Sequence, residues 1–300
     1  MKILDLKTMQ QCEISENTVV ALGTFDGCHL GHTSVLSRAF LEAKRLKAKT
    51  VAYTFSTIPK NASAILTLDE KIRRIRNCHI DYVAIDEFES VKEKSGEEFV
   101  NEVLFGRLRA VYAVCGFNYR FGKGASCGAE NLTEMLEKNG GSVAICDKVV
   151  YEDKTVSSTL IRELIQDGEV EAILPFSCPY SVYARVELGK QLGRTIGIPT
   201  INQIIPDQKI KPKRGVYITE CEIGEDVYPS ITNVGVRPTV ESSGVENMET
   251  HIIGYDGILY SSYVRVNFYK RLRDEMTFDS LDSLKEQIAL DISEAKKYFK

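Results

Sequence analysis

Two of the four histidines in this 300-residue sequence lie three residues apart in one glycine-rich segment. The segment reads GTFDGCHLGH over residues 23–32 and contains His29 and His32. Glycine lets the backbone come close to a phosphate group, and imidazoles can donate hydrogen bonds to phosphoryl oxygens. The segment therefore predicts a site for an anionic, phosphate-bearing ligand, although a polar loop that merely needs glycine turns has the same composition.

The flanking sequence predicts the elements that hold this segment. Residues 18–22 (TVVAL) form an apolar, β-branched run typical of a strand, and apolar residues recur at helical spacing after Thr33. Residues 50–55 (TVAYTF) predict another strand, so the three elements form a βαβ unit with parallel strands. The histidine pair would lie at a helix start, where unpaired N–H groups and the helix dipole favour an anion. Neither a Walker-type lysine nor GxGxxG spacing is present, which argues against a P-loop and a dinucleotide fingerprint.

The alternation of strand and helix patterns continues through the first half of the chain. Further strands are predicted at residues 81–86, 111–115 and 142–146. Helices are predicted near residues 69–77 and after the hydroxyl residues at 157–159, and another begins at a capping box at 95–98 and ends at residue 108. This order predicts an α/β domain around a parallel sheet.

Beyond about residue 175 the pattern changes to short β-rich runs separated by Gly and Pro turns, which is typical of a small antiparallel barrel or sandwich. Only the end is helical, with an apolar stripe from Leu281 to Ala295. We therefore predict a first domain over residues 1–178 and a second over residues 179–300, the second being a small antiparallel β-barrel with a terminal helix.

Composition and charge indicate which classes of protein are compatible with the sequence. Hydrophobic residues make up 43% of the chain and charged residues 27%, as in ordinary soluble globular proteins, and the formal net charge is −4. Without a basic domain or stripe, the sequence predicts no nucleic-acid partner. The eight cysteines form no CxxC pair, the N-terminus lacks a secretion signal, and no apolar run approaches about 20 residues. These features predict reduced thiols, no membrane partner and a cytoplasmic location, and they leave the oligomeric state open.

A second polar motif, SSTLIR, occupies residues 157–162. Its hydroxyls, the N–H groups of a helix start and Arg162 would hold triphosphate oxygens, although the motif read alone is simply a good helix cap. GTFDGCHLGH and SSTLIR together resemble the HxGH and SSTxIR signatures of the nucleotidyltransferase superfamily, whose histidines contact the nucleotide phosphates. The resemblance implies a Rossmann-like first domain that transfers a nucleotide from a triphosphate to a phosphate-bearing acceptor.

In the second half, residues 193–202 read GRTIGIPTIN. Pro199 stiffens a turn that presents Thr200 and Asn202. A hydroxyl and an amide oxygen two residues apart suit Mg²⁺, which prefers oxygen ligands and takes few of them from protein. A barrel turn with polar tips would have the same pattern.

The GRTIGIPTIN segment resembles the GRxxGxPTxN motif of riboflavin kinases. GVYIT, NVGVRPTV, METHIIGY and the ending that starts with RLRDEMTF follow at intervals similar to that family's. Both halves together resemble bacterial bifunctional riboflavin kinase/FAD synthetases over nearly the whole chain. The resemblance implies two reactions: ATP-dependent phosphorylation of riboflavin to FMN in the C-terminal half, and adenylylation of FMN by a second ATP, giving FAD and pyrophosphate, in the N-terminal half.

The resemblance also implies the roles of individual residues. The catalytic set is His29, His32, Arg162 and Glu249, with Glu249 as the base of the kinase. ATP and its phosphates would contact Gly23, Thr24, Phe25, Asp26, Gly31, Ser157, Ser158, Thr159, Gly193, Arg194, Gly197 and Pro199. Flavin would contact Asn118 and Arg273, and Mg²⁺ would bind Thr200 and Asn202.

The sequence departs from the family's pattern at four places. Thr57-Ile58 stands where Pro-His is frequent, Asn118 where Asp is frequent, Ile198 where Phe is usual, and Ser261 where Gly is common. Two other functions are compatible with parts of the sequence: adenylyl transfer to another acceptor, such as phosphopantetheine or nicotinamide mononucleotide, and a nucleotide- or flavin-binding regulator. The kinase-like half argues against the first, and the presence of His29, His32, Asn202 and Glu249 argues against the second.

Overall fold

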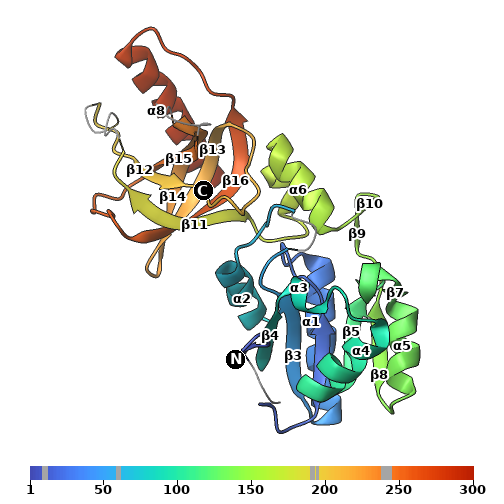
Figure 1. Ribbon diagram of the computed structural model, residues 1–300. Coiled ribbons are helices and arrows are strands. Elements are labelled where there is room, and N and C mark those ends of the chain that lie inside the picture. Colours follow the sequence, from blue (N-terminus) through green and yellow to red (C-terminus); the bar gives the residue numbers. More distant parts are fainter. Residues whose placement is uncertain (9–12, 59–61, 190–192, 194–195, 238–244) are drawn as a thin grey trace. The chain divides into compact units, whose positions relative to one another are not determined.

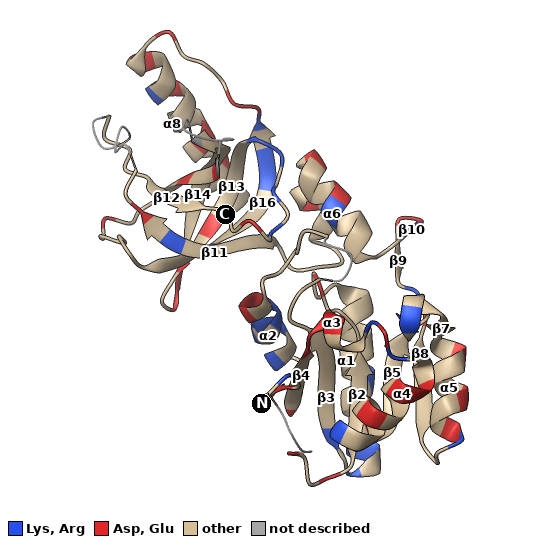
Figure 2. Cartoon of the chain, viewed as in Figure 1, with Lys and Arg blue, Asp and Glu red and all other residues tan. Residues whose placement is uncertain are grey.

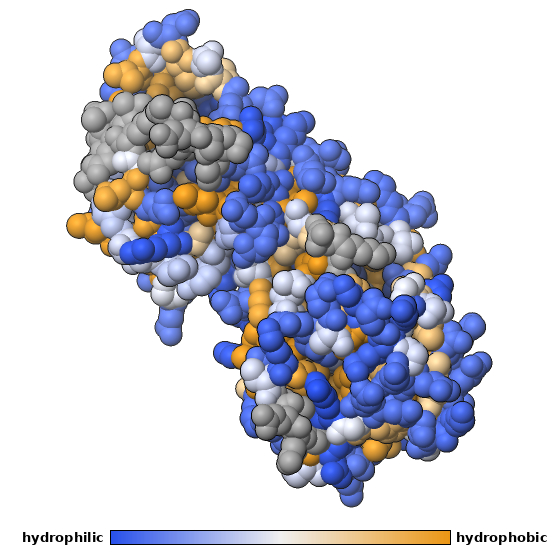
Figure 3. All heavy atoms as spheres, in the orientation of Figure 1, coloured by the Kyte–Doolittle hydropathy of each residue, from blue (hydrophilic) through white to orange (hydrophobic). Residues whose placement is uncertain are grey.

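The chain divides into two compact units, Met1–Ser158 and Thr159–Lys300. The computed structural model describes all residues except 9–12, 59–61, 190–192, 194–195 and 238–244 (Figure 1). Acidic and basic residues are interspersed on the elements of both units (Figure 2), and hydrophilic residues cover most of the face shown in Figure 3. No helix in the described part of the chain is both long and apolar enough to cross a membrane.

The first unit is built on a six-stranded sheet with the order β1-β4-β3-β2-β5-β8, in which all neighbours are parallel. The strands are β1 (Lys2–Asp5), β2 (Thr18–Leu22), β3 (Lys49–Phe55), β4 (Tyr82–Asp86), β5 (Ala110–Gly116) and β8 (Ser142–Cys146). The predicted Rossmann-like parallel sheet is confirmed. The edge strand β1 had not been predicted, because its short KILD pattern resembles a loop.

Side chains alternate along β2 between two separate cores, one on each face of the sheet. Val20 and Leu22 pack in one hydrophobic cluster, and Val19 and Ala21 in the other. A parallel strand covered by helices on both faces needs such a continuous apolar run, which is why TVVAL lacks the polar alternation of a half-exposed strand. All five of its residues are buried.

Helices cover both faces of this sheet. Helix α1 (Leu30–Leu46) and helix α2 (Leu68–Arg76) contribute apolar residues to one cluster, and helix α5 (Ala129–Glu137) contributes to the other. The other short elements are α3 (Phe88–Val91), α4 (Gly96–Glu98), the π-helix Phe99–Arg107, the 3₁₀ helix Lys123–Ala125, β6 (Arg120–Phe121), β7 (Cys127–Gly128), β9 (Val150–Tyr151) and β10 (Lys154–Thr155). The capping box predicted at residues 95–98 is confirmed.

The strand order reverses at β2, and this reversal locates the ligand-binding edge. From β2 the chain passes to β3 and β4 on one side, and it then returns to β5 on the other side. In such doubly wound sheets, ligands bind outside the carboxyl ends of the strands at this switch point. Here the carboxyl end of β2 leads into GTFDGCHLGH, and that of β5 leads into residues 117–119.

The second unit contains a closed antiparallel barrel with the order β11-β12-β15-β14-β13-β16, followed by helix α8 (Leu281–Tyr298). The barrel strands are β11 (Tyr180–Glu187), β12 (Ile201–Ile204), β13 (Gly215–Ile223), β14 (Asp226–Arg237), β15 (Val245–Ile252) and β16 (Tyr263–Arg273). Helix α6 (Ser158–Asp167) and the 3₁₀ helix Val170–Ile173 precede them. The predicted barrel and terminal helix are confirmed. Ile218 and Ile231 of the barrel pack with Ala295 of α8.

A line of buried hydroxyl groups joins three barrel strands on the side opposite to α8. Thr219 Oγ1 lies 2.8 Å from both Ser230 Oγ and Thr232 Oγ1, and Thr232 Oγ1 lies 2.9 Å from Thr250 Oγ1. All four side chains are fully buried. Each hydroxyl can donate to one neighbour and accept from another, so the polar groups stay hydrogen-bonded without water.

We expect Thr232→Val to destabilise the barrel by about 2 kcal/mol, because the isosteric change leaves the buried hydroxyls of Thr219 and Thr250 without a shared partner. Native-state hydrogen exchange of the β14 amides in the full chain measures this free energy. Thr277→Val, at an exposed position, is the matched control and should change the exchange little. Equal protection in both variants would contradict a stabilising role for the hydroxyl line.

Candidate active sites in the two units

The loop between β2 and α1 adopts a backbone that L-residues rarely adopt. Phe25, Gly27 and Cys28 have φ angles of 50°, 91° and 43°. Non-glycine residues in this left-handed region cost about 1–3 kcal/mol each, and such strain persists only where the surroundings over-determine it. The loop must therefore be held by strong contacts.

A buried carboxylate provides the main contacts. Asp26 is fully buried, and its oxygens accept hydrogen bonds from the backbone N–H of Ile65 at 3.0 and 3.2 Å and from that of Leu66 at 3.1 Å. Charge-assisted bonds of this kind are about twice as strong as neutral ones. Asp26 thus fixes the loop from inside, while its predicted contact with ATP stays a prediction.

Two hydroxyl groups hold the loop's backbone carbonyls. Thr54 Oγ1 donates to the carbonyl of Thr24 at 2.9 Å, and Ser158 Oγ donates to the carbonyl of Asp26 at 2.6 Å. The second bond joins the two motifs GTFDGCHLGH and SSTLIR, which are 132 residues apart in sequence. Ser158 therefore acts in this structure by holding the loop.

Lys71 supports the same loop and was missed by sequence reasoning. Its side chain is 1% exposed, and Nζ donates to the carbonyl of Phe55 at 2.9 Å and to Thr54 Oγ1 at 3.3 Å. Burial lowers the pKa of Lys71, and the nearby Asp26 carboxylate acts against this shift. The sequence shows Lys71 only as one cation of a basic helix, so nothing there distinguishes it from the exposed Arg73 and Arg76.

The two histidines predicted to contact phosphates lie together at the end of this loop. The rings of His29 and His32 are stacked with their centroids 3.8 Å apart, and the ring of Phe25 meets His32 edge-on at 5.5 Å. His29 is 6% exposed, and this burial lowers its pKa to about 4, so the imidazole is neutral at neutral pH. Its buried Nδ1 has no hydrogen-bond partner among the described residues.

Two predicted phosphate-binding glycines make room for this arrangement. A Cβ atom at Gly31 would lie 3.1 Å from Cε1 and Nδ1 of His29, and one at Gly23 would lie 3.0 Å from the ring of Phe25. Both distances are shorter than normal carbon contacts. The glycines are thus needed for the positions of the two rings.

Helix α1 begins between the two histidines, with His29 as its N-cap and His32 in its first turn. It starts at Leu30, three residues before the predicted start, because His29 already has the extended backbone of an N-cap residue. The His29 side chain makes no capping hydrogen bond, and the first turn has no acidic residue. No acidic residue of the first turn therefore offsets the positive end of the helix dipole.

Asn118 lies at the same edge of the sheet. It is exposed in a turn that follows β5, closed by a 3.0 Å hydrogen bond from the N–H of Tyr119 to the carbonyl of Gly116. Since β5 is the parallel neighbour of β2, the sheet brings Asn118 and the histidine loop to one edge. The boundary between the units lies inside SSTLIR, so the predicted ligand contacts of Ser157, Thr159 and Arg162 stay predictions.

In the second unit, strand register aligns three predicted or candidate polar residues. Glu249 of β15 is paired with Asn202 of β12 on one side and with Asn233 of β14 on the other. Directly opposed residues of neighbouring strands point to the same face of a sheet. The barrel thus sets a carboxylate between two amides, and Asn233 is a residue that the sequence reasoning had not assigned.

Glu249 opens into a cavity of about 260 Å³ between the barrel and helix α8. Its polar lining includes Asn233, Glu249, His251 and Arg273, and its apolar lining includes Ile231, Met276, Phe278, Leu284 and Ile288. A cavity with an apolar wall and a few polar groups suits a flat aromatic ligand with a polar tail.

Arg273 is held in this cavity by a buried carboxylate. Its Nη2 lies 2.7 Å from Asp291 Oδ2, and Nε donates to both Asp291 oxygens at 3.2 Å. Asp291 is 4% exposed and also accepts a 3.0 Å hydrogen bond from Gln287 Nε2. Asp291 was missed because, in the sequence, it is one acidic residue on an otherwise ordinary amphipathic helix.

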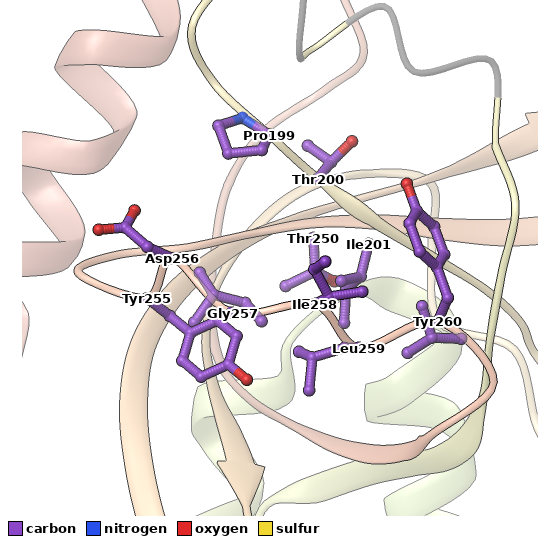
Figure 4. Close-up of a pocket in the computed structure, with 12 residues that line it drawn as sticks. Pro199, Thr200, Ile201, Thr250, Tyr255, Asp256, Gly257, Ile258, Leu259 and Tyr260 are labelled. Carbon is purple, nitrogen blue, oxygen red and sulfur yellow. The ribbon is translucent and has the colours of Figure 1, made fainter.

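The barrel has a second cavity, of about 230 Å³ (Figure 4). Pro199 and Thr200 form one side, and the segment from Tyr255 to Tyr260 forms another. Thr200 lines both cavities. It is the residue that the two linings have in common.

The turn before Thr200 depends on two of the predicted glycines. A Cβ at Gly193 would lie 2.3 Å from the carbonyl oxygen of Ile198, whose N–H donates to the Gly193 carbonyl at 2.8 Å. Gly197 has a φ of 79°, which favours glycine. Arg194, which was predicted to contact ATP, lies outside the described residues.

Thr200 and Asn202 present oxygen ligands suitable for Mg²⁺. They are two residues apart at the start of β12, so an extended backbone directs their side chains to the same face. The Asn202 amide occupies space left by Gly189, where a Cβ would lie 2.2 Å from Nδ2. The described residues contain no group of three or more His, Cys, Asp or Glu that could hold a metal ion. A hydroxyl and an amide oxygen are the donors a hard cation accepts.

Comparisons with known proteins match the two units in order. The family model described as FAD synthetase matches residues 11–160, and the model described as riboflavin kinase matches residues 176–299. The bifunctional riboflavin kinase/FMN adenylyltransferase of Bacillus subtilis is 30% identical over 299 residues, which cover 96% of this chain and 94% of that protein. The protein of the same name from Escherichia coli is 30% identical, with 95% of this chain and 93% of that protein covered.

A solved structure is similar over nearly the whole chain. A crystal structure described as that of a macrolide-efflux protein from Streptococcus pneumoniae has a TM-score of 0.88 and 28% sequence identity, and 99% of each chain is covered. The description as a macrolide-efflux protein applies to the protein from Streptococcus pneumoniae and is not carried over to this chain.

We expect His29 in the full chain to titrate with a pKa near 4, because its buried site disfavours the imidazolium. Binding of ATP should raise this pKa, since phosphate oxygens stabilise the positive ring. NMR titration of ring-labelled histidine measures both values, and the resonance is assigned by its loss in His29→Gln. An ordinary value of about 6.5 without ATP would contradict the burial of the ring.

Proposed function

This chain belongs to the family of bifunctional riboflavin kinases/FMN adenylyltransferases, and from that premise we propose that its two candidate sites divide the two reactions. The chain is a transferase that phosphorylates riboflavin to FMN with ATP and adenylylates FMN to FAD. We assign FAD formation to residues 1–178 and FMN formation to residues 179–300. We further propose that it works in the cytoplasm, where the ATP for both reactions is made.

In the first unit, we propose that the loop and the start of α1 bind the phosphates of ATP. A phosphate oxygen of FMN attacks the α-phosphorus of ATP, and pyrophosphate leaves. The buried, stacked imidazoles support this proposal most directly, because a neutral ring can donate a hydrogen bond to a phosphoryl oxygen without first losing the solvation of a charge. The N–H groups at the start of α1 would stabilise the developing negative charge.

Asn118 would contact the flavin from the neighbouring strand end. An amide keeps hydrogen-bonding capacity where the family often has a carboxylate, and it adds no negative charge beside the phosphate of FMN. Arg162 would join the phosphate contacts through its guanidinium group, which binds phosphate oxygens in pairs.

In the second unit, we propose that riboflavin occupies the cavity at Glu249 and that ATP occupies the cavity bordered by Tyr255 and Tyr260. The single observation that carries this assignment is that Thr200 borders both cavities while Glu249 opens into one of them. The carboxylate takes the proton of the ribityl 5′-hydroxyl, whose oxygen attacks the γ-phosphorus of ATP, and ADP leaves. Arg273, fixed by Asp291, would contact the flavin.

Mg²⁺ would be held by Thr200 and Asn202 and would neutralise part of the triphosphate charge. The pairing of Asn202 with Glu249 fixes the base next to these oxygen ligands. Proton removal and phosphate positioning are thus built on neighbouring strands, where the ladder limits their relative movement.

A chromatographic time course with riboflavin, ATP and Mg²⁺ tests both activities at once. Purified protein should convert riboflavin first to FMN and then to FAD. FMN without FAD would contradict the assignment of the first unit, and no product would contradict both.

His29→Ala should lower FAD formation from supplied FMN by about 100-fold or more, because it removes a donor aimed at the phosphates. FMN formation from riboflavin should remain at the wild-type rate, which also shows that the second unit is folded. Loss of both activities in a protein with a wild-type circular dichroism spectrum would contradict separate sites.

Glu249→Gln should lower FMN formation from riboflavin by about 100- to 10,000-fold, because an amide cannot accept the hydroxyl proton. FAD formation from supplied FMN should be unchanged. Steady-state kinetics of both reactions measure the two effects, and a wild-type rate of riboflavin phosphorylation would exclude Glu249 as the base.

A further inference from the structure

His251 makes a contact that the proposed reaction does not use. Its ring Nδ1 lies 2.9 Å from the backbone carbonyl oxygen of Pro199. A carbonyl oxygen can only accept, so Nδ1 carries the proton and donates. The contact joins residues 52 positions apart in sequence, from β15 to the chain just before β12.

This hydrogen bond restrains the one torsion angle of Pro199 that its ring leaves variable. The pyrrolidine ring fixes φ near −65°. The direction of the Pro199 carbonyl is set by ψ, and the same peptide plane carries the N–H of Thr200. Holding the carbonyl therefore fixes the direction in which the chain enters Thr200.

The β12–β15 ladder holds the other side of Thr200. Its first pair is Ile201 with Thr250, one residue after Thr200. Thr200 lies between this pair and the His251–Pro199 hydrogen bond, so both neighbouring peptides are anchored to β15.

We propose that His251 is a positioning residue that sets the Thr200 hydroxyl between the two cavities of the kinase unit. The inference rests on the proposed kinase function of this unit. His251 lines the same cavity as Glu249 and is two residues away on β15, so the base and the positioning group share one face of one strand. A shift of Glu249 and a shift of Thr200 are thereby linked through β15.

The bond should matter more for geometry than for stability. Pro199 is exposed and His251 is partly exposed, and such a hydrogen bond contributes only about 0.5–1.5 kcal/mol to folding. A displacement of a catalytic group by about 1 Å can lower a rate about 100-fold. Loss of the bond should therefore lower the rate of phosphorylation without unfolding the barrel.

Three variants separate this role from others. In His251→Asn the amide nitrogen takes the place of Nδ1 and keeps the donor. His251→Gln places its amide nearer the position of Nε2, and His251→Leu has no donor. Asparagine and leucine are therefore the informative pair, and glutamine is the control for polarity alone.

The experiment measures riboflavin phosphorylation in the full chain. His251→Leu and His251→Gln should lower kcat about 10- to 100-fold with the KM for riboflavin unchanged, and His251→Asn should remain within about threefold of wild type. A rise in the KM for riboflavin without a fall in kcat would instead mean direct contact with substrate, and would overturn the inference. An asparagine variant as slow as the leucine variant, or a leucine variant as fast as wild type, would overturn it as well.

A second measurement needs no activity. The methyl resonance of Thr200, in threonine-labelled protein and assigned through Thr200→Val, should shift in His251→Leu and keep its wild-type position in His251→Asn. An unshifted resonance in His251→Leu would overturn the inference. If wild-type protein failed to phosphorylate riboflavin, the proposed function would fall, and this resonance would still decide whether His251 positions Thr200. FAD formation from supplied FMN should be the same in all variants.

Discussion

The first candidate site depends on the buried carboxylate of Asp26, which holds the loop before α1. It is fully buried, and it accepts hydrogen bonds from the backbone N–H groups of Ile65 and Leu66. Because an unpaired buried carboxylate would be very costly, the loop and the chain at residues 65–66 must stay together. The left-handed backbone at Phe25 and Cys28 belongs to this held loop, which leads into α1, where the rings of His29 and His32 stack.

In the second unit, strand pairing in the barrel holds the candidate site. Here a closed barrel fixes the register, so that Glu249 has Asn202 and Asn233 as partners on its two neighbouring strands. A slip of β15 by one residue would turn Glu249 to the other face and break both pairings. The buried hydroxyl line of Thr219, Thr232 and Thr250 is another specific set of contacts that such a slip would break.

In both candidate sites, side chains outside the predicted motifs hold predicted residues or the backbone that carries them. Asp291 fixes Arg273, Lys71 supports Thr54 beneath the histidine loop, and Ser158 closes that loop from the other motif. Reactions that depend on the position of phosphates gain most from groups that need no rearrangement. The supporting residues are buried or hydrogen-bonded to backbone, which limits their movement.

The sequence by itself determined the elements and the motifs. Apolar periodicity located β2, β3 and α1 because burial on one or both faces needs a fixed spacing of apolar residues. It also placed GTFDGCHLGH at a strand end, since glycines and an extended N-cap residue are local requirements. The start of α1 was three residues off, because the cap depends on the backbone of His29 and not on a capping side chain.

Only the tertiary structure decided which distant residues support these motifs. Asp26 is hydrogen-bonded to residues 39 and 40 positions away in the sequence. Asp291 is hydrogen-bonded to Arg273, 18 positions away, and His251 to Pro199, 52 positions away. Such pairings follow from strand order and barrel closure, which leave no periodic signal in the sequence. The sequence does not distinguish a buried lysine such as Lys71 from an exposed one. The difference appears only when the chain is folded and packed.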